Sequence, residues 1–172
     1  KIKPYATGFY RLNGKDEAER LSDEALMHYE NGFDHMKIKL GFGVSDDLKV
    51  MESIQKTLSN RNCTFMIDIN HAYGVTEALE LGYALEKFNL RWYEEPVVPE
   101  NIQGYAYLRN KLKIPIAGGE NEHTLYGFKD LFKLGCVDIA QPDIGSCGGI
   151  TAAKHISILA QSFGIEVNPH VW

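Results

Sequence analysis

The sequence predicts an α/β fold: a (β/α) barrel of the TIM type in which parallel strands alternate with helices, and which is incomplete in this chain. Three observations lead to this prediction. Short apolar runs rich in β-branched and aromatic residues alternate with longer segments whose apolar residues recur every three or four positions. Ionisable residues gather where the short runs end. Seven strands can be counted, whereas a closed barrel needs eight.

Seven segments have the composition and length of strands. They are Lys3–Phe9, Phe33–Leu40, Cys63–Ile69, Leu90–Glu95, Ile114–Ala117, Val137–Ala140 and Ile165–Asn168. An open doubly wound sheet also has this alternation, but no glycine fingerprint follows the first strand, which disfavours a nucleotide-binding fold. A barrel of seven strands would leave two parallel edges exposed. We therefore expect residues beyond Trp172, and before Lys1, to complete the fold.

The helices are predicted from apolar stripes and from the residues that flank them. The stripes are Leu48, Met51, Ile54 and Leu58 after Ser45 as N-cap; Ala78, Leu81, Leu85 and Phe88 with Thr76 as N-cap; Ile102, Tyr105, Leu108 and Leu112; and Ala152, Ile156, Leu159 and Phe163. Gly32 and Gly164 follow helices at positions where a left-handed C-cap is expected. No linker or internal domain boundary is visible, so one domain is predicted.

Composition excludes several classes of protein. Of 172 residues, 44% are hydrophobic and 11% aromatic, which is too much apolar material for a disordered chain. No apolar run is long enough to span a bilayer, and no basic stripe indicates nucleic-acid binding at a net charge of -5. Three cysteines without metal spacing or a signal peptide indicate reduced thiols in a cytoplasmic protein.

Six successive strands each end in an ionisable residue. These residues are Lys39, Asp68, Glu94, Glu120, Asp143 and His170, and the steps between them are 29, 26, 26, 23 and 27 residues. The C-terminal rim of a barrel is where active sites are built, so we expect these side chains to share one site. Because residues i and i+2 share a face of a strand, Lys37 should point with Lys39, and Asn70 with Asp68. Glu94 and Glu95 should point in opposite directions.

Three of these residues have the properties of metal ligands. Asp68, Glu94 and Glu120 would repel one another unless a cation lay between them, and an all-oxygen ligand set favours Mg²⁺. Mutual repulsion between Lys37 and Lys39, together with the nearby metal, predicts a lowered pKa for at least one of them, as a general base requires.

The opposite wall of the predicted site has a second acid/base pair. A carboxylate such as Asp143 beside the imidazole of His170 would select its tautomer and stabilise its charged form. A base on each side of a divalent ion suits removal of a proton α to a carboxylate, because the ion stabilises the ene-diolate as charge develops. The second base can then return a proton, which gives racemisation or epimerisation, or protonate a leaving hydroxyl, which gives dehydration.

The motifs Lys-x-Lys, Asp-x-Asn, Glu-Glu-Pro, Gly-Glu-Asn, Pro-Asp and Pro-His, in this order, resemble the enolase superfamily, mandelate racemase subgroup. The resemblance implies Asp68, Glu94 and Glu120 as Mg²⁺ ligands and Lys39 and His170 as the opposed acid/base residues. It implies that Asp143 is the partner of His170, that Lys37 contacts the substrate carboxylate, and that Asn70 contacts substrate or the metal shell. His71, which follows Asn70, is a further candidate substrate contact.

The segments 117–123 and 168–172 look most like the sugar-acid dehydratases and the galactarolactone cycloisomerase of that subgroup. Residues 1–172 would then be part of the C-terminal barrel domain, and the capping domain and last strand would lie outside the chain. The first hypothesis is a Mg²⁺-dependent dehydratase that converts a sugar acid to a 2-keto-3-deoxy acid. Members of the family are commonly oligomers, so the full-length form is expected to be a homo-oligomer.

The same sequence features are compatible with other functions. A racemase, epimerase or lactone cycloisomerase would use the same residues. A metal-free barrel aldolase would use Lys39 as a Schiff base. A non-catalytic fragment would keep the rim only to bind a metal or a partner. In each enzymatic case the expected partner is a small-molecule carboxylate, not a nucleic acid or a membrane.

Overall fold

The computed structural model describes residues 4–12 and 17–171, and in these residues strands and helices alternate along the chain. The elements are β1 (Ala6–Thr7), α1 (Glu17–Glu30), β2 (His35–Lys39), α2 (Val44–Thr57), β3 (Thr64–Asp68), α3 (Val75–Leu85), the 3-10 helix η1 (Glu86–Phe88), β4 (Tyr93–Glu94), α4 (Ile102–Lys111), β5 (Ile116–Gly118), α5 (Thr124–Lys133), β6 (Ile139–Ala140), α6 (Gly149–Ser162) and β7 (Glu166–Val167).

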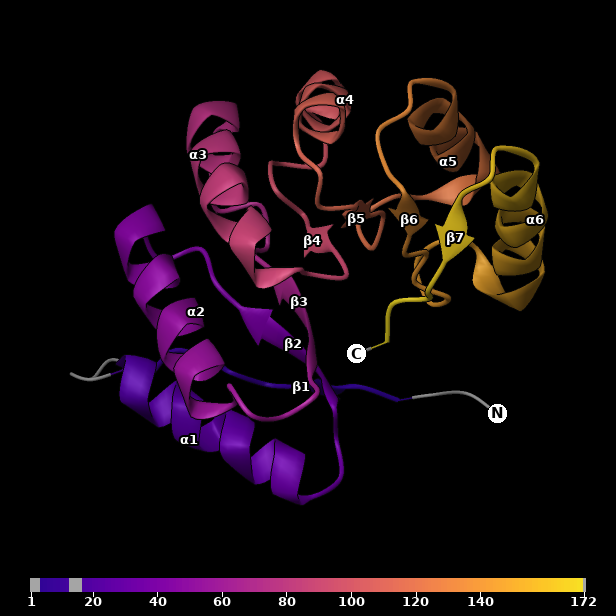
Figure 1. Ribbon diagram of the computed structural model, residues 1–172. Coiled ribbons are helices and arrows are strands. Elements are labelled where there is room, and N and C mark those ends of the chain that lie inside the picture. Colours follow the sequence, from indigo (N-terminus) through magenta and orange to yellow (C-terminus); the bar gives the residue numbers. More distant parts are fainter. Residues whose placement is uncertain (1–3, 13–16, 172) are drawn as a thin grey trace.

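The strands form one parallel sheet in the order β1-β2-β3-β4-β5-β6-β7, so each strand pairs with its neighbours in sequence. The sheet curls into part of a barrel, with the helices on its outer side and the described ends of the chain on its open, inner side (Figure 1). The predicted incomplete (β/α) barrel is confirmed. β1 and β7 are the edges of the sheet.

The two faces of the sheet differ in what they bury. The outer face packs against the helices through a large apolar cluster that includes Ile38, Ile67 and Ile69. The inner face holds a small cluster formed by Met66, Trp92, Ala117 and Ile139, against which Tyr5 packs. Because side chains alternate along a strand, the residue two places after an inner-face residue also points into the barrel.

Two predicted N-caps are wrong. Helix α2 begins at Val44 after Gly43, which has a φ of 111°, and not after Ser45. The turn is held instead by the Asp47 carboxylate, which accepts hydrogen bonds from the N–H groups of Gly41 and Phe42.

Helix α3 begins at Val75 after Gly74, and not at Thr76. The Glu77 carboxylate accepts the N–H of Gly74 at 3.3 Å, which is one of the two hydrogen bonds of a capping box. The predicted C-caps Gly32 and Gly164 are confirmed by their φ of 90° and 70°.

Helix α5 was not among the predicted stripes. It buries Phe128, Leu131 and Phe132, and this i, i+3, i+4 spacing is a helical signal that was present in the sequence. Several strands are shorter than predicted. Only residues that form backbone hydrogen bonds with an adjacent strand belong to the observed strands. In β1, for example, Ala6 and Thr7 pair with Met36 and Lys37, while Lys3 of the predicted strand lies outside the described residues.

Within the described ranges, no helix is both long and apolar enough to cross a lipid bilayer. The cysteines Cys63, Cys136 and Cys147 are free thiols, as predicted.

Candidate metal and acid/base site

Three carboxylates from neighbouring strands meet at the C-terminal rim of the sheet. Asp68 ends β3, Glu94 ends β4, and Glu120 lies two residues after β5. Each residue offers an oxygen atom that lies within 4.8 Å of an oxygen from each of the others. Asp68 and Glu94 follow Met66 and Trp92 on the inner face, which is why their side chains point into the barrel. The sequence-predicted ligand set is therefore brought together.

Both lysines of β2 point at this cluster, as the alternation predicts. Lys37 Nζ lies 2.6 Å from Glu94 Oε1 and 3.4 Å from Asp68 Oδ2. Lys39 Nζ lies 2.6 Å from Asp68 Oδ2 and 2.9 Å from Asn70 Oδ1. The positive charges compensate carboxylates that are fully buried, a state that would otherwise be very costly.

The pKa of Lys37 is raised, so Lys37 is not the lysine with the lowered pKa that was predicted for at least one of the pair. Burial disfavours its charged form, but the charges of Glu94 and Asp68 outweigh burial. Burial also acts on Asp68, yet Lys37 and Lys39 hold the Asp68 pKa below its usual value. The pKa of Glu94 is raised by burial and by the Asp68 charge. In this arrangement each ammonium pairs with a carboxylate.

Trp92 fills the barrel interior and also has a polar role that sequence reasoning missed. Its indole Nε1 donates a hydrogen bond to Glu94 Oε2 at 2.8 Å, while Lys37 occupies the other Glu94 oxygen. Both carboxylate oxygens of Glu94 are thus held in place. The signal was the i, i+2 spacing of Trp92 and Glu94, which places the two side chains on one face.

His170 lies between two carboxylates. Its Nδ1 is 3.0 Å from Asp143 Oδ2, and its Nε2 is 3.3 Å from Glu120 Oε2. The backbones of Asp143 and His170 form a parallel bridge, and Ser146 N–H donates to the second oxygen of Asp143. The hydrogen bond from His170 holds the pKa of Asp143 below its usual value. The predicted His–Asp pair is present.

The cluster fits a divalent cation by its own chemistry. Oε2 of Glu120 is buried and accepts no hydrogen bond from the described residues, although His170 Nε2 is nearby. Adjacent ligands of one Mg²⁺ lie about 3 Å apart and opposite ligands about 4 Å apart. The three carboxylate oxygens lie within 4.8 Å of one another. Asp68, Glu94 and Glu120 would hold it.

One large cavity connects the two walls of the site. It has a volume of about 920 Å³, and its lining includes Lys37, Lys39, Asn70, Glu120 and His170. This volume accommodates a small-molecule ligand. His71 is exposed and is not among the lining residues, so its contact with substrate stays a prediction.

Glu95 lies on the opposite side of the sheet from Glu94, as the strand alternation predicts. It is 1% exposed, and its Oε1 accepts a hydrogen bond from Asn121 Nδ2 at 2.7 Å. Burial, followed by the charge of Glu120, raises the pKa of Glu95 to about 7 despite this hydrogen bond. Sequence reasoning assigned no role to Glu95 or Asn121, although both directly follow predicted metal ligands.

The sequence matches a known family. Residues 20–172 match the sequence family described as "Enolase C-terminal domain-like". The chain belongs to this family.

Named relatives of the chain act on sugar acids or their lactones. It is 42% identical to the D-galactarolactone cycloisomerase of Agrobacterium fabrum, over 99% of this chain and 45% of that protein. It is 32% identical to the arabinonate dehydratase of Saccharolobus solfataricus, again over 99% of this chain and 45% of the relative. The chain thus spans about half the length of the curated relatives that it matches.

Solved structures of similar proteins have the same fold. The 3,6-anhydro-D-galactonate cycloisomerase from Zobellia galactanivorans superposes with a TM-score of 0.93 at 47% identity, over 99% of this chain and 47% of that chain. A racemase from Streptomyces coelicolor with bound magnesium superposes with a TM-score of 0.90 at 28% identity, over 99% of this chain and 50% of that one.

Proposed function

We propose that this chain is part of an enzyme that uses Mg²⁺ as cofactor. The enzyme abstracts a proton α to the carboxylate of a sugar acid or its lactone. The observation that carries this proposal is the convergence of Asp68, Glu94 and Glu120 beside a cavity lined by both Lys39 and His170. A bound Mg²⁺ would stabilise the negative charge that develops on the substrate carboxylate as the proton leaves.

Lys39 and His170 are the proposed acid/base residues. Each holds a titratable nitrogen at the cavity wall, and each is oriented by a carboxylate: Asp68 for Lys39, and Asp143 for His170. One takes the α proton and the other delivers a proton to the departing oxygen or to the opposite face of the substrate. Lys37 and Asn70 are proposed to contact the polar groups of the substrate from the same cavity wall.

The leaving oxygen decides between the two outcomes that we favour. If the β-oxygen is a hydroxyl, its loss releases water, and the enzyme is a dehydratase. If the β-oxygen belongs to a ring, its loss opens the ring without loss of atoms, and the enzyme is a cycloisomerase. Both outcomes begin with the same proton abstraction. Relatives named for each reaction match the chain.

The test is a product assay on the full-length protein. The protein is incubated with a panel of sugar acids and their lactones, with Mg²⁺ or with EDTA, and 2-keto products are detected with semicarbazide. Mass spectrometry then separates loss of water from isomerisation. We expect activity that requires Mg²⁺ and is lost in Glu94→Gln, and full activity of that variant would contradict the ligand assignment.

Two other hypotheses have distinct outcomes in the same assay. Exchange of the α proton in D₂O without a keto product would identify a racemase or epimerase. Activity that survives EDTA, together with borohydride trapping of an adduct on Lys39, would identify a Schiff-base aldolase. A full-length protein that binds metal but turns over no substrate would support a non-catalytic role.

The chain is proposed to be part of the barrel domain of a longer enzyme, because its relatives extend over about twice its length. Small-molecule carboxylates are its proposed partners. Homo-oligomerisation of the full-length form stays a prediction.

A further inference from the structure

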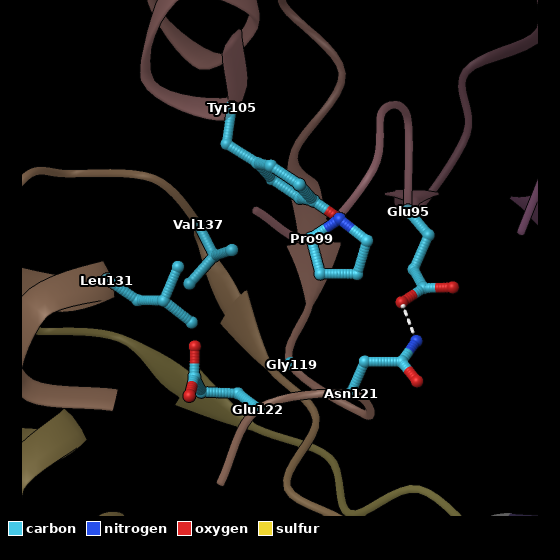
Figure 2. Close-up of a pocket in the computed structure, with 8 residues that line it drawn as sticks. All are labelled: Glu95, Pro99, Tyr105, Gly119, Asn121, Glu122, Leu131 and Val137. Carbon is cyan, nitrogen blue, oxygen red and sulfur yellow. Dashed lines mark hydrogen bonds between the residues drawn. The ribbon is translucent and has the colours of Figure 1, made fainter. Parts of the chain in front are cut away.

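Glu95 is a buried acid that the proposed chemistry does not use. Its side chain points to the helix side of the sheet, where it lies with Pro99, Tyr105, Leu131 and Val137 around a small pocket (Figure 2). The pocket has a volume of about 10 Å³, which is room for about one water molecule. Glu95 therefore cannot contact a sugar acid there, and its role has to be sought in the protein contacts that it makes.

The contacts of Glu95 reach two loops of the site. Figure 2 shows the Glu95 carboxylate and the Asn121 amide facing each other, and Nδ2 of Asn121 donates to Oε1 at 2.7 Å. The backbone oxygen of Glu95 accepts the N–H of His71 at 2.9 Å, in the loop that follows β3. Glu95 has a φ of 46°, a left-handed conformation that is strained for a residue with a side chain. The strained residue lies directly after the last residue of β4, Glu94.

The loop after β5 is where such a contact matters most. Asp68 and Glu94 belong to strands, whereas Glu120 lies in a turn between Gly119 and Asn121. Gly119 has a φ of 118°, and a Cβ added there would lie 2.8 Å from the Phe128 ring. One side of Glu120 is thus a glycine turn, and the other side is Asn121, whose side chain Glu95 holds.

We propose that Glu95 is a positioning residue for Glu120, which acts by holding Asn121 and so fixing the loop that presents the third metal ligand. A buried carboxylate in a largely apolar pocket is costly, and Oε2 of Glu95 accepts no hydrogen bond from the described residues. An apolar side chain would fill this space at lower cost, so packing alone does not explain the acid. The inference rests on the proposed function for its metal site.

The experiment measures Mn²⁺ affinity in the full-length protein, from the EPR signal of free Mn²⁺, beside kcat and KM. Glu95→Met keeps the length of the side chain but removes the acceptor oxygen, and Asn121→Ala removes the donor. Each of these two variants should bind Mn²⁺ about tenfold more weakly than the parent. This is the smaller end of the loss in metal affinity that follows mutation of residues that orient metal ligands. Glu95→Gln keeps an acceptor oxygen and should bind Mn²⁺ like the parent protein.

A double variant tests whether the two residues act through one contact. Glu95→Met combined with Asn121→Ala should lose no more affinity than either single variant, because the second change removes nothing further. The control is Asn101→Ala, which removes the N-cap of α4 by deleting the acceptor of the Gly104 N–H. It should lower the Tm and leave Mn²⁺ affinity unchanged.

Parent-like Mn²⁺ affinity in both Glu95→Met and Asn121→Ala would overturn the inference, as would additive losses in the double variant. If Glu95→Met fails to fold, Asn121→Ala decides alone, because Asn121 is exposed and its truncation should leave the fold intact. A parent protein that binds Mn²⁺ but turns over no sugar acid would overturn the proposed function and leave this inference standing. A parent that binds no Mn²⁺ would overturn both.

Discussion

Asp143 accepts a hydrogen bond from Nδ1 of His170 at 3.0 Å, and the backbones of the two residues form a parallel bridge. The contact joins the ends of two adjacent strands, so the imidazole orientation is set both by the backbone and by the carboxylate. With Nδ1 occupied, Nε2 is the nitrogen directed toward Glu120 and the cavity. His170 thus presents one defined nitrogen to a ligand.

Asp143→Asn should lower kcat while the protein stays folded. An amide can donate to Nδ1 and so favour the wrong tautomer, which in comparable histidine–aspartate pairs costs about 10²- to 10⁴-fold in rate. The measurement is kcat and KM on the substrate found in the product assay. Mn²⁺ affinity serves as the control and should change little, and an unchanged kcat would contradict the role of Asp143.

The same pair predicts a pH dependence of stability. The pKa of Asp143 is lower in the folded protein than in the unfolded chain, where it is about 3.9. Asp143 therefore stabilises the fold above that value, and this contribution is lost as the pH falls through the folded pKa. The difference in free energy of unfolding between parent and Asp143→Asn should shrink below about pH 4. Urea titrations over this pH range test it, and a difference that stays constant would contradict it.

Lys37→Met should destabilise the metal-free protein and strengthen Mg²⁺ binding. Removal of the ammonium leaves Glu94 buried without its counter-charge, and breaking a buried pair in this way costs about 3–5 kcal/mol. Saturating Mg²⁺ should recover part of this loss, because the ion supplies positive charge to the same carboxylates. Urea denaturation with EDTA and with Mg²⁺ measures both effects.

A matched control for Lys37→Met is Lys87→Met. Lys87 pairs with Glu52 at 2.7 Å, but both side chains are more than half exposed. Such surface pairs contribute about 0–1 kcal/mol, and this variant should show no Mg²⁺-dependent difference from the parent. An equal Mg²⁺ dependence in the two lysine variants would show that the effect does not arise at the carboxylate cluster.

Trp92→Phe should destabilise the protein and weaken its metal affinity. The change removes the indole N–H that holds Glu94 Oε2, and an unsatisfied buried acceptor costs about 1–3 kcal/mol. Tyr93→Phe is the control, because the Tyr93 hydroxyl donates to Ala78 O on the helix side of the sheet. Isothermal titration with Mg²⁺ should show weaker binding for Trp92→Phe alone, and equal affinities in the two variants would be evidence against the polar role of Trp92.

Most of the fold was predictable because it depends on local periodicity. The alternation of apolar runs and helical stripes is sufficient for a parallel sheet with outer helices, and the family resemblance agrees with it. The N-caps were wrong because the backbone at Gly43 and Gly74 adopts turns that side chains further along stabilise. A propensity for serine or threonine at a helix start does not include such contacts.

The sequence alone determined which groups reach the rim, because the strand period and the spacing of successive βα units place Lys37, Lys39, Asp68, Glu94 and His170 on one face at one end of the sheet. The tertiary structure decided how these groups pair: Lys37 with Glu94, Trp92 with the other oxygen of Glu94, and Glu95 with Asn121. The pairs join residues from different strands and loops. Their distances, and hence the direction in which each pKa shifts, depend on the curvature of the sheet and the course of the loops, and no local pattern encodes either.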